Sequence, residues 1–217
     1  MKYVQSGMVV GLGTGTTADE FLQVLARDLK AGKVENIRGI PTSLQSERRA
    51  MELGIPLTTL VEHPRPDVTI DGADEIDPDL ELIKGLGGAL LREKIVAQNS
   101  SKLVIIADAG KVVPKLGTRA MLPVEVVPFA QETHVGFIQG LGATAILRLN
   151  ADGKPFVTDN GNYIYDCRFP RGIDQPLKLE QALMRRAGIV ETGLFLQMAA
   201  VAVIADNLHV EVCERGK

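Results

Sequence analysis

In the first half of the chain, the spacing of apolar positions alternates between that of strands and that of helices. Between short apolar runs lie stretches with helical spacing, such as residues 17–31, where Phe21, Leu25 and Leu29 fall on one face. Helices are also predicted over 42–54 and through about Asn99. The apolar runs predict strands at residues 8–12, 37–41, 57–60, 67–71, 80–83 and 102–107. This alternation predicts an α/β fold with a parallel sheet and helices on both of its faces.

The pattern changes after residue 122. A helix is predicted around residues 131–141 and another over 177–187, and the dipeptide Asn160-Gly161 separates two alternating runs, which is typical of a β-hairpin. We therefore predict a small α+β domain with an antiparallel sheet over residues 123–197. An apolar strand at 200–205 is expected to return to the first sheet, so that residues 1–122 and 198–217 form the other domain.

A capping box is predicted at the start of each of the first two helices. Thr17 with Glu20 fits the start of the first helix, and Thr42 with Gln45 fits the start of the second. Glycines at positions 32 and 54 are expected to end the same two helices.

Composition excludes several classes of protein. The 217 residues are 45% hydrophobic, enough for a core without disulfides or metals, and Cys167 and Cys213 are typical of a reducing compartment. A net charge of −3 and an aromatic content of 4% argue against nucleic acid as a partner. No apolar run is long enough to span a bilayer, and the first residues lack a signal-peptide core. We therefore expect a soluble cytoplasmic protein with no membrane partner.

The stretch GLGTGTTA, residues 11–18, follows the first predicted strand and carries the spacing G-x-G-x-x-A. A dinucleotide site would require an acidic residue after the second strand, but that strand runs into Pro41, Thr42 and Ser43. The stretch is interpreted either as a cradle for a phosphate monoester or as a tight turn with capping threonines. The residues that would form the cradle are Thr14, Gly15, Thr16 and Thr17.

The stretch DGADEIDPDLE, residues 71–81, begins where a buried strand is expected to end, which is where ligands bind in open α/β sheets. Its spacing is not that of an EF-hand and no histidine lies nearby, so we expect no metal. Asp71 and Asp74 fit acids that bind sugar hydroxyls. The alternative is a solvated acidic turn, which is the interpretation we give to Asp77 and Asp79.

The stretch KGLGGALLREK, residues 84–94, places Lys84 and three glycines before a helix, where exposed amides can bind an anion. Glu93 lies among apolar neighbours, which could raise the pKa of its carboxyl and suit it to act as a base. The alternative is a surface glutamate in helix salt bridges. Lys111, after the apolar strand, is either a charge at the rim of the site or a surface lysine.

In this order and spacing, GLGTGTTA, PTS, DGADEID, KGLGGALLREK and IADAGK resemble the type A ribose-5-phosphate isomerases. The later stretches LPVEVVPF, VTDNGNYIYDC and ETGLF fit the same family. The resemblance implies a Rossmann-like domain with a small ferredoxin-like insert, assembled as a homodimer or a dimer of dimers. It also implies interconversion of ribose 5-phosphate and ribulose 5-phosphate in the pentose phosphate pathway, without metal or organic cofactor.

The resemblance also implies roles for individual residues. Glu93 matches the base that moves the proton between C2 and C1, Asp71 the acid–base group for ring opening, and Lys84 the cation at the enediolate. The remaining matches in the substrate site are Gly72, Ala73, Asp74, Gly85, Leu86, Gly87 and Lys111 beside Thr14, Gly15, Thr16 and Thr17. Family members usually begin with a helix that supplies a phosphate-binding lysine. The given sequence starts at Met1 without this helix, so either the protein begins upstream of Met1 or it binds phosphate with fewer cations. For the given residues we expect weaker phosphate binding.

Two other classes of function share part of this pattern. A sugar-phosphate sensor could use the same fold, but no segment is typical of DNA binding and a sensor needs no pairing of Glu93 with Lys84. A nicotinamide dehydrogenase lacks its acidic residue after the second strand.

Overall fold

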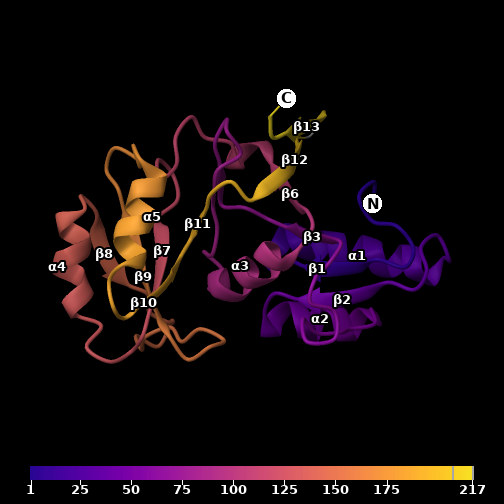
Figure 1. Ribbon diagram of the computed structural model, residues 1–217, viewed down its shortest axis with the longest axis horizontal. Helices are drawn as coiled ribbons and strands as arrows, with labels where there is room; N and C mark the ends of the chain where they lie inside the picture. The colour runs from indigo at the N-terminus through magenta and orange to yellow at the C-terminus, as the bar shows by residue number, and fades with distance from the viewer. Residues whose placement is uncertain (207, 217) are drawn as a thin grey trace. The chain divides into compact units, whose positions relative to one another are not determined.

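The computed structural model describes residues 1–206 and 208–216 (Figure 1). Contacts divide the chain into two compact units: Met1–Ala73, Arg92–Ala109 and Gln197–Lys217 form the first, and Asp74–Leu91 and Gly110–Leu196 form the second. Residues 74–91 and 110–122, which the sequence assigned to the first domain, thus make most of their contacts with the second unit. The domain division at residues 122 and 198 stays a prediction.

The first unit contains a six-stranded sheet in the order β13-β12-β6-β3-β1-β2. Every neighbouring pair is parallel except β12 and β13, so the predicted mostly parallel sheet is confirmed. The returning strand β12 pairs with β6, as the apolar run at its position predicted. Residues 57–60 form no strand and make only a single bridge from Leu57 to Gly39. The strands are β1 (Val9–Leu12), β2 (Arg38–Pro41), β3 (Val68–Asp71), β6 (Leu103–Asp108), β12 (Ala199–Ala205) and β13 (Val210–Glu214).

Helices α1 (Thr16–Lys30) and α2 (Leu44–Leu53) do not begin with the predicted capping boxes. Gly15 precedes α1 with a φ of 105°, and no side chain caps the helix. For α2, the box is formed one residue later, by Ser43 and Ser46. Thr42 lies one residue before the N-cap, and its hydroxyl instead donates to the carbonyl oxygen of Leu12, 2.9 Å away.

The ends of these helices and the third helix agree with the prediction. Gly54 ends α2 in the left-handed conformation, and α3 spans Leu90–Asn99. The predicted apolar face of α1 packs into the core of the first unit, where Leu22 and Leu25 meet Val10 and Ile70.

The second unit contains a four-stranded antiparallel sheet in the order β10-β7-β9-β8, with α4 beside β8 and α5 beside β10 (Figure 1). This confirms the antiparallel sheet expected after residue 122. A separate three-stranded sheet has the order β11-β5-β4. The elements are β4 (Glu75–Ile76), β5 (Leu82–Ile83), β7 (Leu122–Val126), α4 (Thr133–Gly140), β8 (Thr144–Leu147), β9 (Tyr163–Arg168), α5 (Pro176–Met184), β10 (Ile189–Thr192) and β11 (Leu194–Phe195). A short 3₁₀ helix, η1, spans Ala109–Lys111.

The turn predicted at Asn160-Gly161 is present, but one arm of the hairpin is not a strand. Gly161 has a φ of 82° and donates its N–H to the carbonyl of Thr158. The strand β9 follows the turn and pairs with β7 and β8. The arm before the turn runs beside another segment, where the N–H of Phe156 donates to the carbonyl of Arg148. An alternating pattern alone does not distinguish these two partners.

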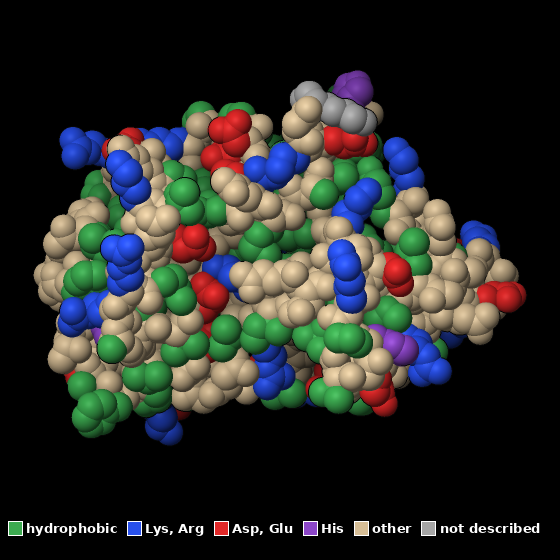
Figure 2. All heavy atoms as spheres, in the orientation of Figure 1, with side chains coloured by type: hydrophobic (Ala, Val, Ile, Leu, Met, Phe, Trp, Pro, Cys, Tyr) green, Lys and Arg blue, Asp and Glu red, His purple; other side chains and the backbone are tan. Residues whose placement is uncertain are grey.

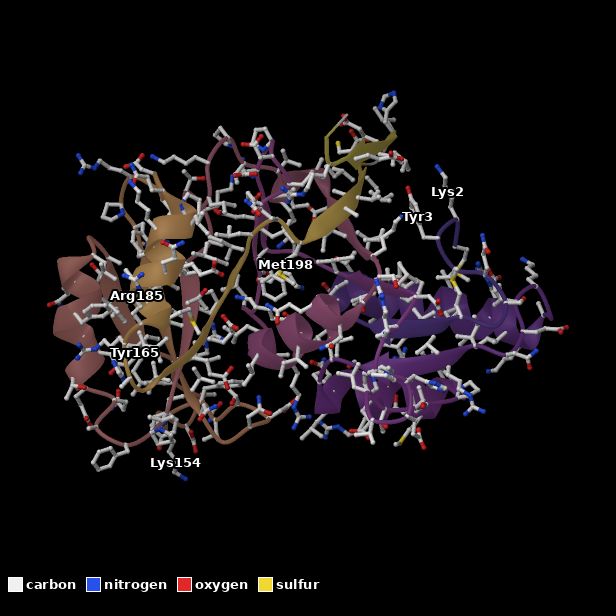
Figure 3. The ribbon with its side chains drawn as sticks, viewed as in Figure 1. Lys2, Tyr3, Lys154, Tyr165, Arg185 and Met198 are labelled. Atoms are coloured by element: carbon white, nitrogen blue, oxygen red, sulfur yellow. The ribbon has the colours of Figure 1, made fainter. Side chains whose placement is uncertain are left out.

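The core of the second unit includes polar atoms with partners of their own. Tyr165 of β9, labelled in Figure 3, is buried and donates its hydroxyl to Gln131 Oε1. Cys167 lies two residues further along the same strand and is also buried. The second cysteine, Cys213, is half-buried on β13 of the first unit.

On the face drawn in Figure 2, basic and acidic side chains are interspersed rather than gathered by sign. In the described part of the chain, no helix is both long and apolar enough to cross a membrane.

We predict that the two cysteines differ in reactivity. Burial, with a smaller contribution from Asp166, raises the pKa of the Cys167 thiol to about 12, so this group stays protonated at pH 8. A thiol reagent at pH 8 should label Cys213 in the native protein and Cys167 only after denaturation. Equal labelling rates of both thiols in the native protein would contradict this burial of Cys167.

Candidate active site

The loop after β1 is fixed by the carboxylate of Asp71. The N–H of Thr14 donates to Asp71 Oδ1 at 3.1 Å, and the Thr14 hydroxyl lies 2.8 Å from the hydroxyls of both Thr42 and Ser43. Gly13 lies directly against Asp71: a Cβ at position 13 would be 2.3 Å from Asp71 Oδ1 and 2.6 Å from its Cα. The first glycine of the predicted motif is therefore required by the close approach of Asp71.

The start of α1 offers peptide N–H groups to an anion. No side chain caps this helix, and Gly15 and Thr16 at its start are exposed. A helix of 15 residues brings the positive end of its dipole to the same place. A cavity of about 510 Å³ borders the loop and is also lined by Arg49. The arrangement suits a phosphate group.

Arg49 on α2 is held by two carboxylates. Its Nε lies 2.5 Å from Asp19 Oδ1, and its Nη1 lies 3.2 Å from Glu52 Oε2. The hydrogen bond from Arg49 lowers the pKa of the Asp19 carboxyl below its usual value. Sequence analysis did not single out Arg49, because its spacing is that of an ordinary charged helix face.

Asp71 is a buried, hydrogen-bonded carboxylate at the end of β3. It is 1% exposed, and its Oδ1 accepts the N–H of Gly72 at 2.7 Å as well as that of Thr14. This excludes the solvated acidic turn as an interpretation of Asp71. In the first unit the structure thus brings together Thr14, Asp71 and Gly72, with Thr17 Cβ about 4.0 Å from a Cβ placed on Gly72.

The other acids of this stretch belong to the second unit. Asp74 is half-buried, and its Oδ2 accepts the N–H of Leu86 at 3.0 Å, so it contacts the glycine-rich loop after β5. Asp77 instead accepts the N–H groups of Asp79 and Glu81 and closes its own turn. Burial raises the pKa of the Asp77 carboxyl above its usual value.

Glu75 is a structural residue that sequence analysis did not identify. It is fully buried, and its carboxylate accepts N–H groups from Gly117, Arg119 and Ala120. It therefore organises the segment that follows Lys111. Nothing in the acidic stretch distinguishes Glu75 from its neighbours, because its partners lie more than forty residues away in sequence.

Lys84 is buried at the end of β5. It is 2% exposed, and its ammonium lies 5.3 Å from the centre of the Phe195 ring. Its peptide N–H donates to the carbonyl of Gly193. A Cβ at Gly193 would lie 2.3 Å from the Lys84 carbonyl oxygen, so only glycine fits there. Gly193 and Phe195 lie in the stretch ETGLF, whose only signal in the sequence was the family resemblance.

The loop of Gly85, Leu86, Gly87 and Gly88 makes a tight turn after Lys84. Gly85 and Gly88 have φ values of 97° and 86°, which favour glycine, and the N–H of Gly88 donates to the carbonyl of Gly85. Leu86 and Gly87 at the tip are exposed. The turn therefore presents peptide groups to solvent or to a ligand.

Glu93 lies in the first turn of α3 and is 3% exposed. This burial excludes the interpretation as a solvated surface glutamate. Glu93 belongs to the first unit, whereas Lys84 and the half-buried Lys111 of η1 belong to the second. Ala73 is half-buried and is the last residue of the first unit before Asp74.

Comparisons with known proteins agree with these features. Residues 38–208 match the family model of ribose 5-phosphate isomerase A (phosphoriboisomerase A). The chain belongs to the ribose 5-phosphate isomerase A family. It is similar to ribose-5-phosphate isomerase A of Desulfatibacillum aliphaticivorans, with 53% identity over 94% of this chain and 89% of that protein.

Solved structures of ribose 5-phosphate isomerases share the fold. The enzyme of Plasmodium falciparum superposes with a TM-score of 0.96 at 41% identity, covering 100% of this chain and 94% of that one. A D-ribose-5-phosphate isomerase in complex with phospho-erythronic acid superposes with a TM-score of 0.96 at 38% identity, covering 99% and 93%. The α/β fold and the family resemblance drawn from the sequence are thereby confirmed.

We predict that Gly13→Ala destabilises the protein. The added methyl group would overlap Asp71, and overpacking of this kind costs about 1–3 kcal/mol of the free energy of unfolding. The control is Gly136→Ala on α4, where the site is open and alanine should add about 0.5–1 kcal/mol. Chemical denaturation measures the free energy of unfolding of both variants. An equal loss in Gly13→Ala and Gly136→Ala would show that Asp71 does not constrain position 13.

Proposed function

We propose that this chain interconverts D-ribose 5-phosphate and D-ribulose 5-phosphate by proton transfer through an enediolate. The observation that carries the proposal is the buried Asp71 carboxylate, which fixes the loop before the uncapped start of α1. Membership of the ribose 5-phosphate isomerase A family supports the same reaction.

The phosphate group is assigned to the loop of Thr14, Gly15, Thr16 and Thr17. A dianion there receives peptide N–H groups and the positive end of the helix dipole. The Thr14 hydroxyl is already bonded to Thr42 and Ser43, so it shapes the loop, whereas exposed Thr16 can turn its hydroxyl to the phosphate. Binding the phosphate away from the reacting carbons lets this energy orient the sugar.

Proton transfer is assigned to two carboxylates, and a third binds the substrate. Asp71 acts as the acid–base group that opens the furanose ring, and Asp74 binds sugar hydroxyls. Glu93 then removes the C2 proton of the open aldehyde and returns it to C1, while the O2 hydroxyl proton passes to O1, which yields the ketose without a net change in protons. The burial of Glu93 supports this role, because a base shielded from water keeps the proton that it must return.

Stabilisation of the negative charge of the enediolate is assigned to Lys84 and to the loop of Gly85, Leu86, Gly87 and Gly88. The buried ammonium supplies a positive charge at low dielectric, and the glycines allow peptide groups to approach the substrate. Lys111 and the backbone of Gly72 and Ala73 complete the proposed contacts. A solved relative is in complex with phospho-erythronic acid, and because its carboxylate resembles an enediolate in charge, this supports the enediolate route.

We also infer that the protein works in the cytoplasm as a homodimer or a dimer of dimers. Phe129, Ile146 and Leu149 of the second unit support self-association, because these large apolar side chains are between 54% and 87% exposed. Light scattering of the purified protein measures the oligomeric state, and a monomer at micromolar concentration would contradict this inference.

The reaction itself is tested by following ribulose 5-phosphate formation from ribose 5-phosphate in EDTA with no added cofactor. We expect full activity, because the proposed proton transfer needs only Asp71, Lys84 and Glu93 of this chain. Activity that appears only after a divalent ion is added would contradict the cofactor-free mechanism, and no activity under either condition would contradict the proposed function.

We predict that Glu93→Gln lowers turnover at least ~100-fold, because the amide keeps the size of the side chain but cannot accept the C2 proton. Binding of phospho-erythronic acid, measured by calorimetry, should change little. Glu35→Gln is the control, since Glu35 is exposed between α1 and β2 and does not line the cavity beside the phosphate loop. Near-normal turnover of Glu93→Gln would exclude Glu93 as the base.

A further inference from the structure

Arg148 follows β8 in the second unit and forms a buried ion pair with Asp166 of β9. Its Nε lies 2.9 Å from Asp166 Oδ2, and its Nη2 lies 2.5 Å from Asp166 Oδ1, which makes the pair bidentate. The two side chains are only 13% and 12% exposed. The guanidinium is therefore held in one orientation by two hydrogen bonds.

The remaining arm of the guanidinium reaches the glycine-rich loop. Arg148 Nη1 donates to the carbonyl oxygen of Leu86 at 3.0 Å and to that of Gly85 at 3.4 Å. Because each peptide is planar and trans, an oxygen held on one side directs the N–H of the following residue to the opposite side. Arg148 thus sets the direction of the N–H groups of Leu86 and Gly87.

The peptide groups of Leu86 and Gly87 differ in their surroundings. The N–H of Leu86 donates to Asp74 Oδ2, whereas Gly87 is exposed at the tip of the turn. The Phe156 ring lies 5.6 Å from the Arg148 guanidinium and also packs over Gly88, where a Cβ would be 2.5 Å from it. The loop is therefore held from the side of Arg148 and Phe156.

We propose that Arg148 is a positioning residue that orients the peptide N–H of Gly87 toward the developing enediolate oxygen. The guanidinium hydrogen bonds also polarise the same peptides and make their N–H groups stronger donors. This inference rests on the proposed function, which assigns the glycine loop to the enediolate. Lysine cannot replace arginine here, because one ammonium does not hold both Asp166 oxygens and a loop carbonyl in a fixed fork.

The test compares Arg148→Met and Arg148→Lys with a matched control. We expect kcat to fall about 10- to 100-fold, because a displaced oxyanion donor costs about this much in other enzymes. The KM for ribose 5-phosphate should change less than about threefold, because the phosphate is assigned to a different loop. Arg148→Lys should recover little of the lost kcat.

The matched control is Arg186→Met in the same unit. Arg186 also lies over an aromatic ring, 4.6 Å from the centre of Phe137, and donates to a backbone carbonyl, that of Thr133, at 2.8 Å. No described hydrogen bond joins it to residues 84–88. Its kcat and KM should therefore equal those of the unaltered protein.

Removing Arg148 alone leaves Asp166 buried without its partner and endangers the fold. The double variant Arg148→Met/Asp166→Leu removes both charges and keeps the site apolar. It should unfold cooperatively and show the same loss of kcat. A double variant that folds and keeps its kcat within twofold would overturn the proposal, as would a rise in KM at unchanged kcat.

Amide hydrogen exchange without substrate separates this inference from the proposed function. Exchange of residues 84–90 should be at least about tenfold faster in the double variant than in Arg186→Met, because the loop has lost its carbonyl contacts. Equal exchange in the two variants would overturn the positioning role. If the unaltered protein does not isomerise ribose 5-phosphate, the proposed function fails, while exchange still decides whether Arg148 holds the loop.

Discussion

The loop that leads into α1 depends on the hydrogen bonds of the Asp71 carboxylate. One oxygen accepts the N–H groups of Thr14 and Gly72, so the loop after β1 and the end of β3 have one relative placement. That placement leaves no room for a side chain at position 13 and leads the chain into α1 through Gly15. A carboxyl group that is 1% exposed thus shapes the end of the sheet at which α1 begins.

The second unit uses buried charges in the same way, to hold loops rather than to form surface salt bridges. Glu75 gathers three N–H groups from the segment after Lys111, and Arg148 holds two carbonyls of the loop after Lys84. Glu125 accepts hydrogen bonds from Thr158 and Asn162 and fixes the Asn160-Gly161 turn, and burial raises the pKa of its carboxyl. Each group offsets its desolvation with hydrogen bonds to backbone or side chains that would otherwise move.

The proposed function requires these loops to hold peptide groups in fixed directions. A catalytic amide must point within a narrow range of directions, and glycine-rich segments do not restrict themselves. Rigid partners such as Arg148 and Phe156 supply the restriction from outside the loop. The same separation of roles holds for Thr14, whose hydroxyl binds Thr42 and Ser43 while its N–H binds Asp71.

Local pattern was enough to predict the strands β1, β2, β3 and β6, the helices of both units and the mostly parallel sheet, because burial on one face imposes a period on each element. It also marked Asp71, Lys84 and Glu93 as candidates, since each stands in a motif of its own. It did not predict that Ser43 rather than Thr42 caps α2, or that the arm before Asn160 runs beside Arg148. Nor did it identify Glu75, Arg148 or Gly193, whose partners lie 42 to about 110 residues away along the chain. Hydrogen bonds over such separations depend on which segments packing brings together, and no short stretch of sequence contains that information.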